Sequence, residues 1–272
     1  MLVHLDASSA AETRLHLADR LARRHHAALH ALFAVLPPSL DGHFAYSAGA
    51  AMEHADNHDL DGRERVHGLF ERAMQHREPA AVWEESRAEL PLGILCRRAW
   101  VHDLLVLGQD QTSQAGNVPR NLAASMILQS GRPVIVVPPV PGSVEPASIV
   151  LIAWKPSRES ARAVTAALPV LRDAQHVHIA CWHDEADNPI STPDGPGELQ
   201  AQLRRHGIEA VMHVHGSPKV GIGAALLAEA ERLQAGLLVM GCYGHGRARE
   251  WLLGGASRTV LEKASLPVLM VH

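Results

Sequence analysis

Five glycines surround a short basic stretch near the end of the chain. They are Gly241, Gly244, Gly246, Gly254 and Gly255, in MGCYGHGRAREWLLGGASRTV, residues 240–260. Gly241 and Gly244 follow an expected strand, where a positive φ and a close approach to a ligand require glycine. Gly254 and Gly255 open an expected helix, whose first N–H groups suit a phosphate. Turn and cap chemistry alone explains the same glycines equally well, and both hypotheses stay open.

Hydroxyl groups and cations accompany these glycines. Ser257 or Thr259 offers a hydroxyl from the first turn of the expected helix, and Arg247, Arg249 or Arg258 offers a positive charge. These are the side-chain types that hold a phosphate beside a helix N-terminus. The stretch is therefore a candidate anion site.

Catalytic patterns are absent from the sequence. It has no GxSxG elbow, HExxH pair or Walker A lysine. Cys242 and His245 lie three residues apart, but no third group orients them. A loop cysteine and a solvated histidine therefore fit better than a thiolate–imidazole pair. We assign no catalytic residue, and we expect at most slow ATP hydrolysis.

The chain contains 19 histidines, a number that raises the question of a metal site. The pairs HVH at 176–178 and HVH at 213–215 lie in strand-like runs, where both imidazoles of a pair face one side. We favour ordinary surface and sheet histidines over a metal site.

Composition limits the class of protein. The 272 residues, 47% of them apolar, suit two domains of roughly 130 to 140 residues. A net charge of −4 argues against nucleic acid as a partner. Cys96, Cys181 and Cys242 form no CxxC pair, which favours a reducing compartment. We see neither a signal-peptide pattern nor a membrane-spanning run, and we expect a cytoplasmic protein with no membrane contact.

The chain repeats itself. DLLVLGQ matches GLLVMGC, GRPVIVVPP matches SLPVLMVH, and the segment 2–21 matches 150–168, all in the same order. This pattern predicts a tandem duplication with domains at 1–140 and 147–272, joined by a Pro- and Gly-containing linker. Strands are expected at 2–6, 28–35, 80–84, 103–107, 133–137, 148–154, 175–182, 209–215, 236–241 and 267–271. Helices are expected in the second half near 158–172, 197–206, 219–234 and 255–264.

Apolar strands that alternate with helices indicate parallel sheets covered on both faces. Each half is therefore predicted to be a doubly wound α/β domain, with ligands beyond the carboxyl ends of its strands. The strands at 133–137 and 267–271 are expected to meet as an internal pseudo-dimer. Association of two chains stays open.

The spacing Gly241-x2-Gly244-x9-Gly254 resembles the nucleotide-binding signature G-x2-G-x9-G-[S/T] of the universal stress protein family. The resemblance covers essentially the whole chain and includes PVLMV, SRESARAV and GSP. It implies a five-stranded parallel sheet in each half, and a stress-response protein of a family that divides into members that bind ATP and members that do not. In a nucleotide-binding member the ligand would be ATP or AMP, with Mg²⁺ accompanying ATP. Gly241, Gly244 and Gly254 would then line the triphosphate and ribose.

The second half departs from this signature at two positions. Gly255 stands where the family has Ser or Thr, and Ser257 is the nearest replacement. Lys155, followed by Ser157, stands where ATP-binding relatives have an Asp that helps to fix the nucleoside. Lys155 is either a phosphate partner or an exposed loop lysine.

The first half departs in the opposite sense. It keeps Asp6 and Ser8, but of the signature glycines only Gly108 remains in place, and Asp110 would repel phosphate. Pro119 is expected as the first residue of the next helix. This site is degenerate, and any nucleotide belongs to the second half.

Two alternatives to nucleotide binding remain. One is a module that acts through protein–protein contacts with an unknown partner. The other is a different small ligand in the same cleft, with apolar walls from Met240, Trp154 and Leu226. The insert at 37–70 is longer than its counterpart at 183–198. It is treated as a long loop that is either functional, as a lid or a partner surface, or disordered, and this choice stays open.

Overall fold

The computed structural model describes residues 1–36, 49–86, 89–110, 117–140, 148–182, 195–242 and 255–272, with the backbone alone at 49–60 and 195–196. It divides into two compact units, Met1–Arg132 and Pro133–His272. The two domains predicted from the sequence repeat, 1–140 and 147–272, stay a prediction.

The first unit is a parallel sheet in the order β3-β2-β1-β4, with α1 packed against α2 and α3 packed against α4. Its strands are short and apolar, and the helix after β1 buries a stripe that includes Ala11, Leu15 and Ala18. The elements are β1 (Leu2–Leu5), α1 (Ala10–Arg24), β2 (His30–Ala34), α2 (Gly49–Met74), β3 (Val82–Ser86), α3 (Pro91–Ala99), β4 (Leu105–Gly108) and α4 (Leu122–Gln129).

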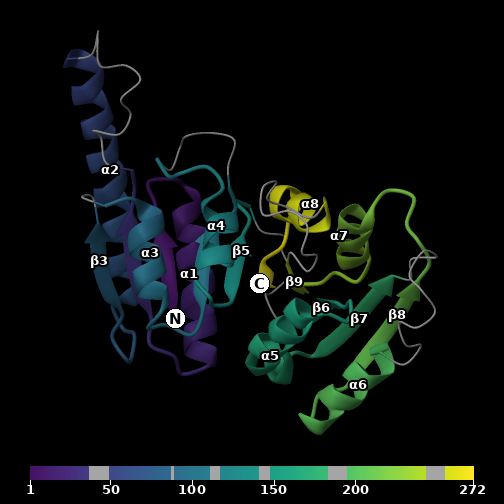
Figure 1. Cartoon of the computed structure of the whole chain (residues 1–272). Coiled ribbons are helices and arrows are strands. Elements are labelled where there is room, and N and C mark those ends of the chain that lie inside the picture. Colours follow the sequence, from purple (N-terminus) through teal and green to yellow (C-terminus); the bar gives the residue numbers. More distant parts are fainter. Residues whose placement is uncertain (37–48, 87–88, 111–116, 141–147, 183–194, 243–254) are drawn as a thin grey trace. The chain divides into compact units, whose positions relative to one another are not determined.

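The second unit has five parallel strands in the order β10-β9-β6-β7-β8. Helices α5 and α6 lie on one face of this sheet, and α7 and α8 lie on the other (Figure 1). The elements are β5 (Val134–Val137), β6 (Ile149–Ala153), α5 (Arg158–Asp173), β7 (His176–Trp182), α6 (Gly195–Arg205), β8 (Ala210–His215), α7 (Ile222–Arg232), β9 (Leu237–Gly241), α8 (Gly255–Lys263) and β10 (Val268–Val271).

The strand β5 pairs antiparallel with β10 and therefore falls within the second unit. Val136 lies opposite Val268, and Ile135 lies opposite Leu269, so the two predicted strands meet as expected. The α/β class, the mostly parallel strands and the helices on both faces are confirmed. Each predicted strand is present in the described part of the chain, within about two residues of its expected ends.

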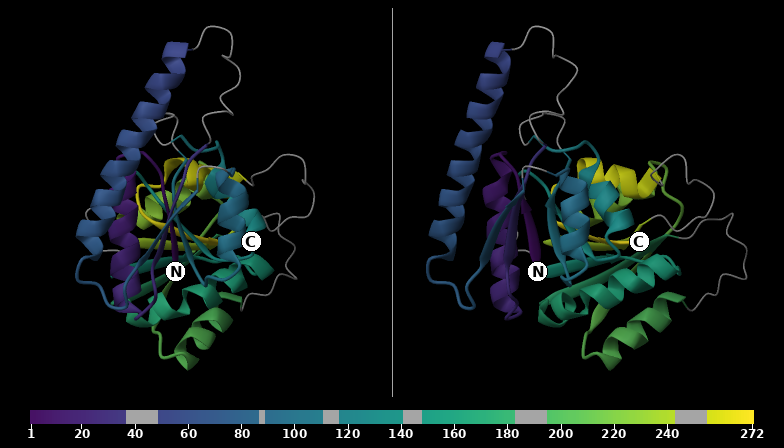
Figure 2. Two further views of the ribbon diagram at one scale, coloured as in Figure 1. Left: turned by 90° about the vertical axis from the view of Figure 1, so that its left-hand side faces the viewer. Right: turned by 60° about the vertical axis from the view of Figure 1, so that its left-hand side comes forward.

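The insert at 37–70 differs from the prediction. Residues 49–70 belong to the long helix α2, so the expectation of a loop there is wrong; residues 37–48 lie outside the described part. Val66, Phe70 and Met74 recur at four-residue spacing and are buried, which anchors the second half of α2. Both views of Figure 2 show the first half of α2 extending past the strands of its unit.

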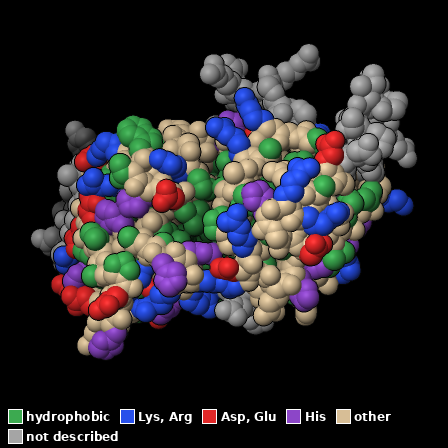
Figure 3. Space-filling view, turned by 90° about the horizontal axis from the view of Figure 1, so that it is seen from below, with side chains coloured by type: hydrophobic (Ala, Val, Ile, Leu, Met, Phe, Trp, Pro, Cys, Tyr) green, Lys and Arg blue, Asp and Glu red, His purple; other side chains and the backbone are tan. Residues whose placement is uncertain are grey.

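Charges are mixed on the surface. On the face drawn in Figure 3, the described basic, acidic and histidine side chains are interspersed. Among the described helices, α2 included, none combines the length and the apolar character needed to cross a membrane.

Candidate functional site

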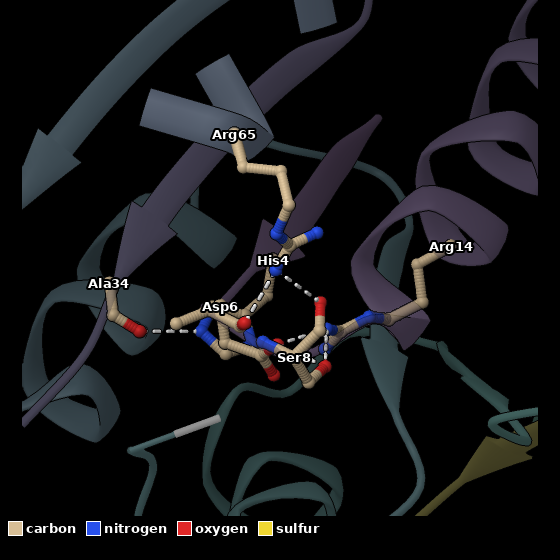
Figure 4. Close-up of polar contacts among 7 residues, drawn as sticks. His4, Asp6, Ser8, Arg14, Ala34 and Arg65 are labelled. Atoms are coloured by element: carbon tan, nitrogen blue, oxygen red, sulfur yellow. Dashed lines mark hydrogen bonds and ion pairs between the residues drawn. The ribbon is translucent and has the colours of Figure 1, made fainter. Parts of the chain in front are cut away.

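In the first unit, the turn after β1 holds a buried ion pair. The Arg14 Nη2 of α1 donates to the Asp6 Oδ1 at 2.5 Å and to the Ser8 Oγ at 3.2 Å, and Ser8 also donates to Asp6. The Arg14 and Asp6 side chains are only 3% and 7% exposed. Figure 4 shows Arg14 and Arg65 converging on this turn from two different helices. The Asp6 carboxylate is thus already occupied by groups of its own unit.

Electrostatics reinforce this pairing. Burial by itself would raise the pKa of Asp6, but the Arg14 guanidinium and its hydrogen bonds outweigh burial and hold that pKa well below its usual range. Burial lowers the pKa of His4 to about 4. The neutral His4 ring lies with its Nε2 2.8 Å from the Ala34 carbonyl oxygen. The site therefore keeps one carboxylate, one guanidinium and a neutral imidazole at neutral pH.

The helix α2 covers the same turn from outside. The Arg65 Nη2 donates to the carbonyl oxygens of Ala7 at 2.6 Å and of Ser8 at 3.3 Å. A Cβ on Gly62 would lie 2.7 Å from the Ala7 Cβ, so the helix backbone packs directly on the turn. The described half of the insert therefore seals the end of β1.

Two further contacts fill the edge where β4 ends. A Cβ on Gly108 would lie 2.6 Å from the Arg14 Nη1, so Gly108 makes room for the guanidinium and not for a ligand. The Asp110 carboxylate accepts hydrogen bonds from the backbone N–H groups of Leu122 and Ala123 at the start of α4. These are the groups that a phosphate would use at a helix N-terminus.

Pro119 does not begin α4. The helix starts at Leu122, after Asn121 in the left-handed conformation with φ of 60°. This reversal of the backbone separates Pro119 from the helix, so that prediction is wrong.

Strand register gives the corresponding positions of the second unit. Leu2 pairs with Leu105 in the first sheet, and Leu151 pairs with Leu238 in the second. Counting forward from these pairs, Lys155 corresponds to Asp6, Gly241 to Gly108, Ala153 to His4 and Ala163 to Arg14. Lys155 is exposed, and Ala163 is buried. A small buried side chain, that of Ala163, therefore holds the position of Arg14 in the second unit.

Gly241 is required by packing. It ends β9, and a Cβ there would lie 2.4 Å from the Ser160 backbone nitrogen and 2.5 Å from the Glu159 carbonyl carbon. The first turn of α5 thus rests on this glycine. Gly241 does not have a positive φ, so the expectation of a left-handed turn there is wrong. The Ser157 hydroxyl caps α5 by accepting from the Ser160 N–H at 3.2 Å.

The helix α8 begins at Gly255, as predicted, and Gly255 is exposed. Ser257 is buried, where its hydroxyl bonds with the Cys242 thiol. The Thr259 hydroxyl donates to the Gly255 carbonyl oxygen at 2.7 Å, and Arg258 pairs with Glu262. The other candidates of this loop lie outside the described residues: Gly244, His245, Gly246, Arg247, Arg249 and Gly254.

The cysteine and the apolar candidates of the second unit lie mostly in the core. Burial raises the pKa of the Cys242 thiol to about 12, although hydrogen bonding with Ser257 acts in the opposite direction. Met240 and Leu226 are buried in the core. Trp154 is half-buried, and its Nε1 has no hydrogen-bond partner among the described residues. A reactive thiol is therefore disfavoured, and Trp154 alone of the apolar candidates reaches the edge.

A family model of the universal stress protein family matches residues 147–272. This segment belongs to that family. It includes the strands β6 to β10 and the whole Gly241-x2-Gly244-x9-Gly254 spacing. No curated protein matches the chain.

Solved universal stress proteins show the same fold over the whole chain. A universal stress protein from Archaeoglobus fulgidus DSM 4304 matches 99% of this chain and 97% of its own, with a TM-score of 0.65 and 16% identity. A putative universal stress protein from Pseudomonas aeruginosa UCBPP-PA14 matches 99% of this chain and 91% of its own, with a TM-score of 0.56 and 15% identity. These likenesses concern the fold.

The side chains that fill the first unit of this universal stress protein fold were not predicted from the sequence. Arg14 was passed over, although a charged residue on the buried stripe of α1, eight residues after Asp6, is a usable signal. The role of Arg65 was hidden because the insert was treated as a loop. Asp110 was expected to repel phosphate, but its use as a cap of α4 was not foreseen.

The described residues offer no arrangement of three or more His, Cys, Asp or Glu side chains that suits a metal ion. His213 and His215 do face one side of β8, with ring centroids 6.5 Å apart and planes 9° from parallel, as the HVH pattern predicted.

Proposed function

We propose that the chain is a stress-response regulatory protein of the universal stress protein type that binds an adenine nucleotide in its second unit alone. One observation carries the proposal. The first unit fills its own strand ends with Arg14 and Asp110, whereas the position of Arg14 is held by Ala163 in the second unit. A ligand of the first unit would have to displace a buried ion pair, which is costly.

The charge of the second unit fits an anionic ligand. Lys155 is exposed at the end of β6, where the first unit has the carboxylate of Asp6. The exposed Gly255 begins α8, and helix starts favour negative charge. In the sequence, the segment with the family spacing Gly241-x2-Gly244-x9-Gly254 runs from the end of β9 to Gly255. ATP or AMP is the ligand class, and Mg²⁺ would accompany ATP.

A module that acts only through protein contacts is the second candidate, and a specific observation favours it. Packing against α5 accounts for Gly241 without any ligand. The hydroxyls of Ser157, Ser257 and Thr259 already bond within the unit. Retained glycines and serines would then be structural.

The test begins with the purified chain and no added nucleotide. The protein is denatured, and released small molecules are separated by anion exchange and identified by mass spectrometry. Thermal unfolding is then followed with millimolar ATP plus Mg²⁺, with AMP and with cAMP. The panel includes cAMP because one solved universal stress protein is a complex with it; that protein is 22% identical with a TM-score of 0.36.

Matched variants locate the site. Gly244→Val in the loop and Lys155→Glu at the end of β6 should each abolish the thermal shift with nucleotide. Lys263→Glu, at the far end of α8 in the same unit, should leave it unchanged. A chain that carries no nucleotide and gains no thermal stability from any of the three would contradict the proposal and favour the protein-contact module.

A further inference from the structure

A cluster of histidines joins two strands to a helix at the outer edge of the second unit. We call His178 of β7, His213 and His215 of β8, and Glu229 and Arg232 of α7 the edge cluster. The His178 Nδ1 lies 3.0 Å from the His213 Nε2. The Glu229 Oε1 lies 3.4 Å from the His215 Nε2 and 3.7 Å from the His213 Nδ1. Arg232 forms two hydrogen bonds to Glu229. One carboxylate therefore faces two imidazoles and one guanidinium, and the third imidazole, that of His178, contacts His213.

The hydrogen bonds of the cluster suit neutral imidazoles. The Arg232 Nη2 lies 3.5 Å from the His213 Nδ1, and in the tautomer in which that nitrogen accepts, the Nε2 carries the proton. The Nε2–H then donates to the unprotonated Nδ1 of His178. If both rings were protonated, two N–H groups would face each other across 3.0 Å. Acid therefore breaks this side-chain contact between His178 of β7 and His213 of β8.

The charges that face the cluster do not offset this protonation. Burial, then His213, His176 and Arg232, lower the pKa of His178, and Glu229 alone raises it. The helix α6 also packs on β8. Its Gln200 side-chain amide, which is neutral, donates a hydrogen bond to the Ala210 carbonyl oxygen. Trp182, at the end of β7, stacks on His215 with ring centroids 5.0 Å apart. Charging His178 thus adds a positive charge near a carboxylate that is already paired with Arg232.

The corresponding edge of the first unit is balanced differently. His30 corresponds to His178 by strand register, since Leu2 pairs with His30 and Leu151 with His178. The His30 Nε2 lies 2.9 Å from the Glu84 carboxylate on β3, and Arg98 of α3 pairs with the same carboxylate. His102 stacks at 5.2 Å. Burial lowers the pKa of His30 too, but protonated His30 would gain a direct ion pair with Glu84, which His178 lacks.

We propose that the edge cluster is an acid-sensitive latch, in which protonation of His178 loosens β8 and α7 of the second unit more than acid loosens the matching edge of the first unit. The direction follows from linkage. Because the pKa of His178 is lower in the folded chain, the stabilisation from its neutral ring is complete above about pH 6.5 and is lost as the pH falls below that value. The ligand proposal is not needed for this inference.

Amide hydrogen exchange of the full chain tests this proposal. Exchange is measured by mass spectrometry at pH 7.5 and pH 5.5, and the rates are corrected for intrinsic exchange. Peptides from residues 210–232 should exchange about tenfold faster at pH 5.5, the factor for one pKa unit of differential protonation. Peptides from residues 82–99 should change much less. Equal protection of 210–232 at both pH values, or equal loss at both edges, would overturn the proposal.

Variants separate the latch from general acid sensitivity. The double change His178→Gln and His213→Gln should remove the acid response of residues 210–232. His16→Gln, an exposed histidine on α1, is the matched control and should keep the response. If the double variant does not fold, the wild-type chain still decides: imidazole NMR signals should show His178 titrating below pH 6.5. Titration of His178 at or above its ordinary value would overturn the proposal.

Discussion

The strand ends of the two units correspond in position but hold different residues. In the first unit, Arg14 fills the space beside Asp6, and Arg65 closes the turn from outside. In the second unit, Ala163 occupies the position of Arg14, and Lys155 occupies that of Asp6. Two units with the same fold can thus differ at matching strand ends, where one holds an internal ion pair and the other a small side chain and an exposed lysine.

Breaking the ion pair should have the largest effect. Arg14→Ala gives the first unit the residue that the second unit has, and leaves the Asp6 carboxylate buried without its cation. We expect a loss of about 3–5 kcal/mol in the free energy of unfolding, measured by urea denaturation. Arg20→Ala, at an exposed position of the same helix, should change stability by less than about 0.5 kcal/mol. Equal losses in the two variants would contradict the comparison.

Acid should weaken the same ion pair. Because the pKa of Asp6 is lowered in the folded chain, its stabilisation is complete above the ordinary Asp value near 4 and is lost as the pH falls below it. Asp6→Asn should cost about 3 kcal/mol at pH 7. The difference from wild type should shrink at pH 3.5 in urea unfolding. A difference that does not depend on pH would show that Asp6 acts by packing alone.

Substitutions of Gly241 and Gly255 distinguish a packing role of these glycines from a ligand-binding role in the second unit. Gly241→Ala places a Cβ 2.4 Å from the Ser160 backbone nitrogen and should destabilise the chain by about 1–3 kcal/mol. Gly255→Ala meets no atom within 4 Å and should stabilise α8 by about 0.5 kcal/mol. Thermal unfolding without ligand measures both. If Gly241→Ala is neutral, the glycine is not kept for packing, and the ligand hypothesis gains weight.

The smallest expected loss of stability concerns the cover that α2 places over the turn. Arg65→Ala removes the hydrogen bonds to Ala7 and Ser8 and should cost about 1 kcal/mol. Exchange of the backbone amides at residues 7–11 should become faster. Arg72→Ala, exposed on the same helix, is the control. Unchanged exchange in Arg65→Ala would mean that α2 does not seal this turn.

The sequence predicted what depends on local pattern. The apolar runs of β4 and β9 and the amphipathic α5 could be recognised without tertiary information. The helix α2 was missed because the insert was judged by its length, although Val66, Phe70 and Met74 carry the helical spacing. The contact of Gly241 with α5 depends on how the chain folds back, and no local pattern contains it.

The number of nucleotides bound per chain tests the central comparison most directly. Native mass spectrometry of the full chain, titrated with ATP and Mg²⁺, counts them. The account predicts one nucleotide per chain in wild type, none in Gly244→Val, and still one in Arg14→Lys, which changes only the first unit. Two nucleotides per chain, or one that Gly244→Val leaves in place, would contradict the assignment of the site to the second unit.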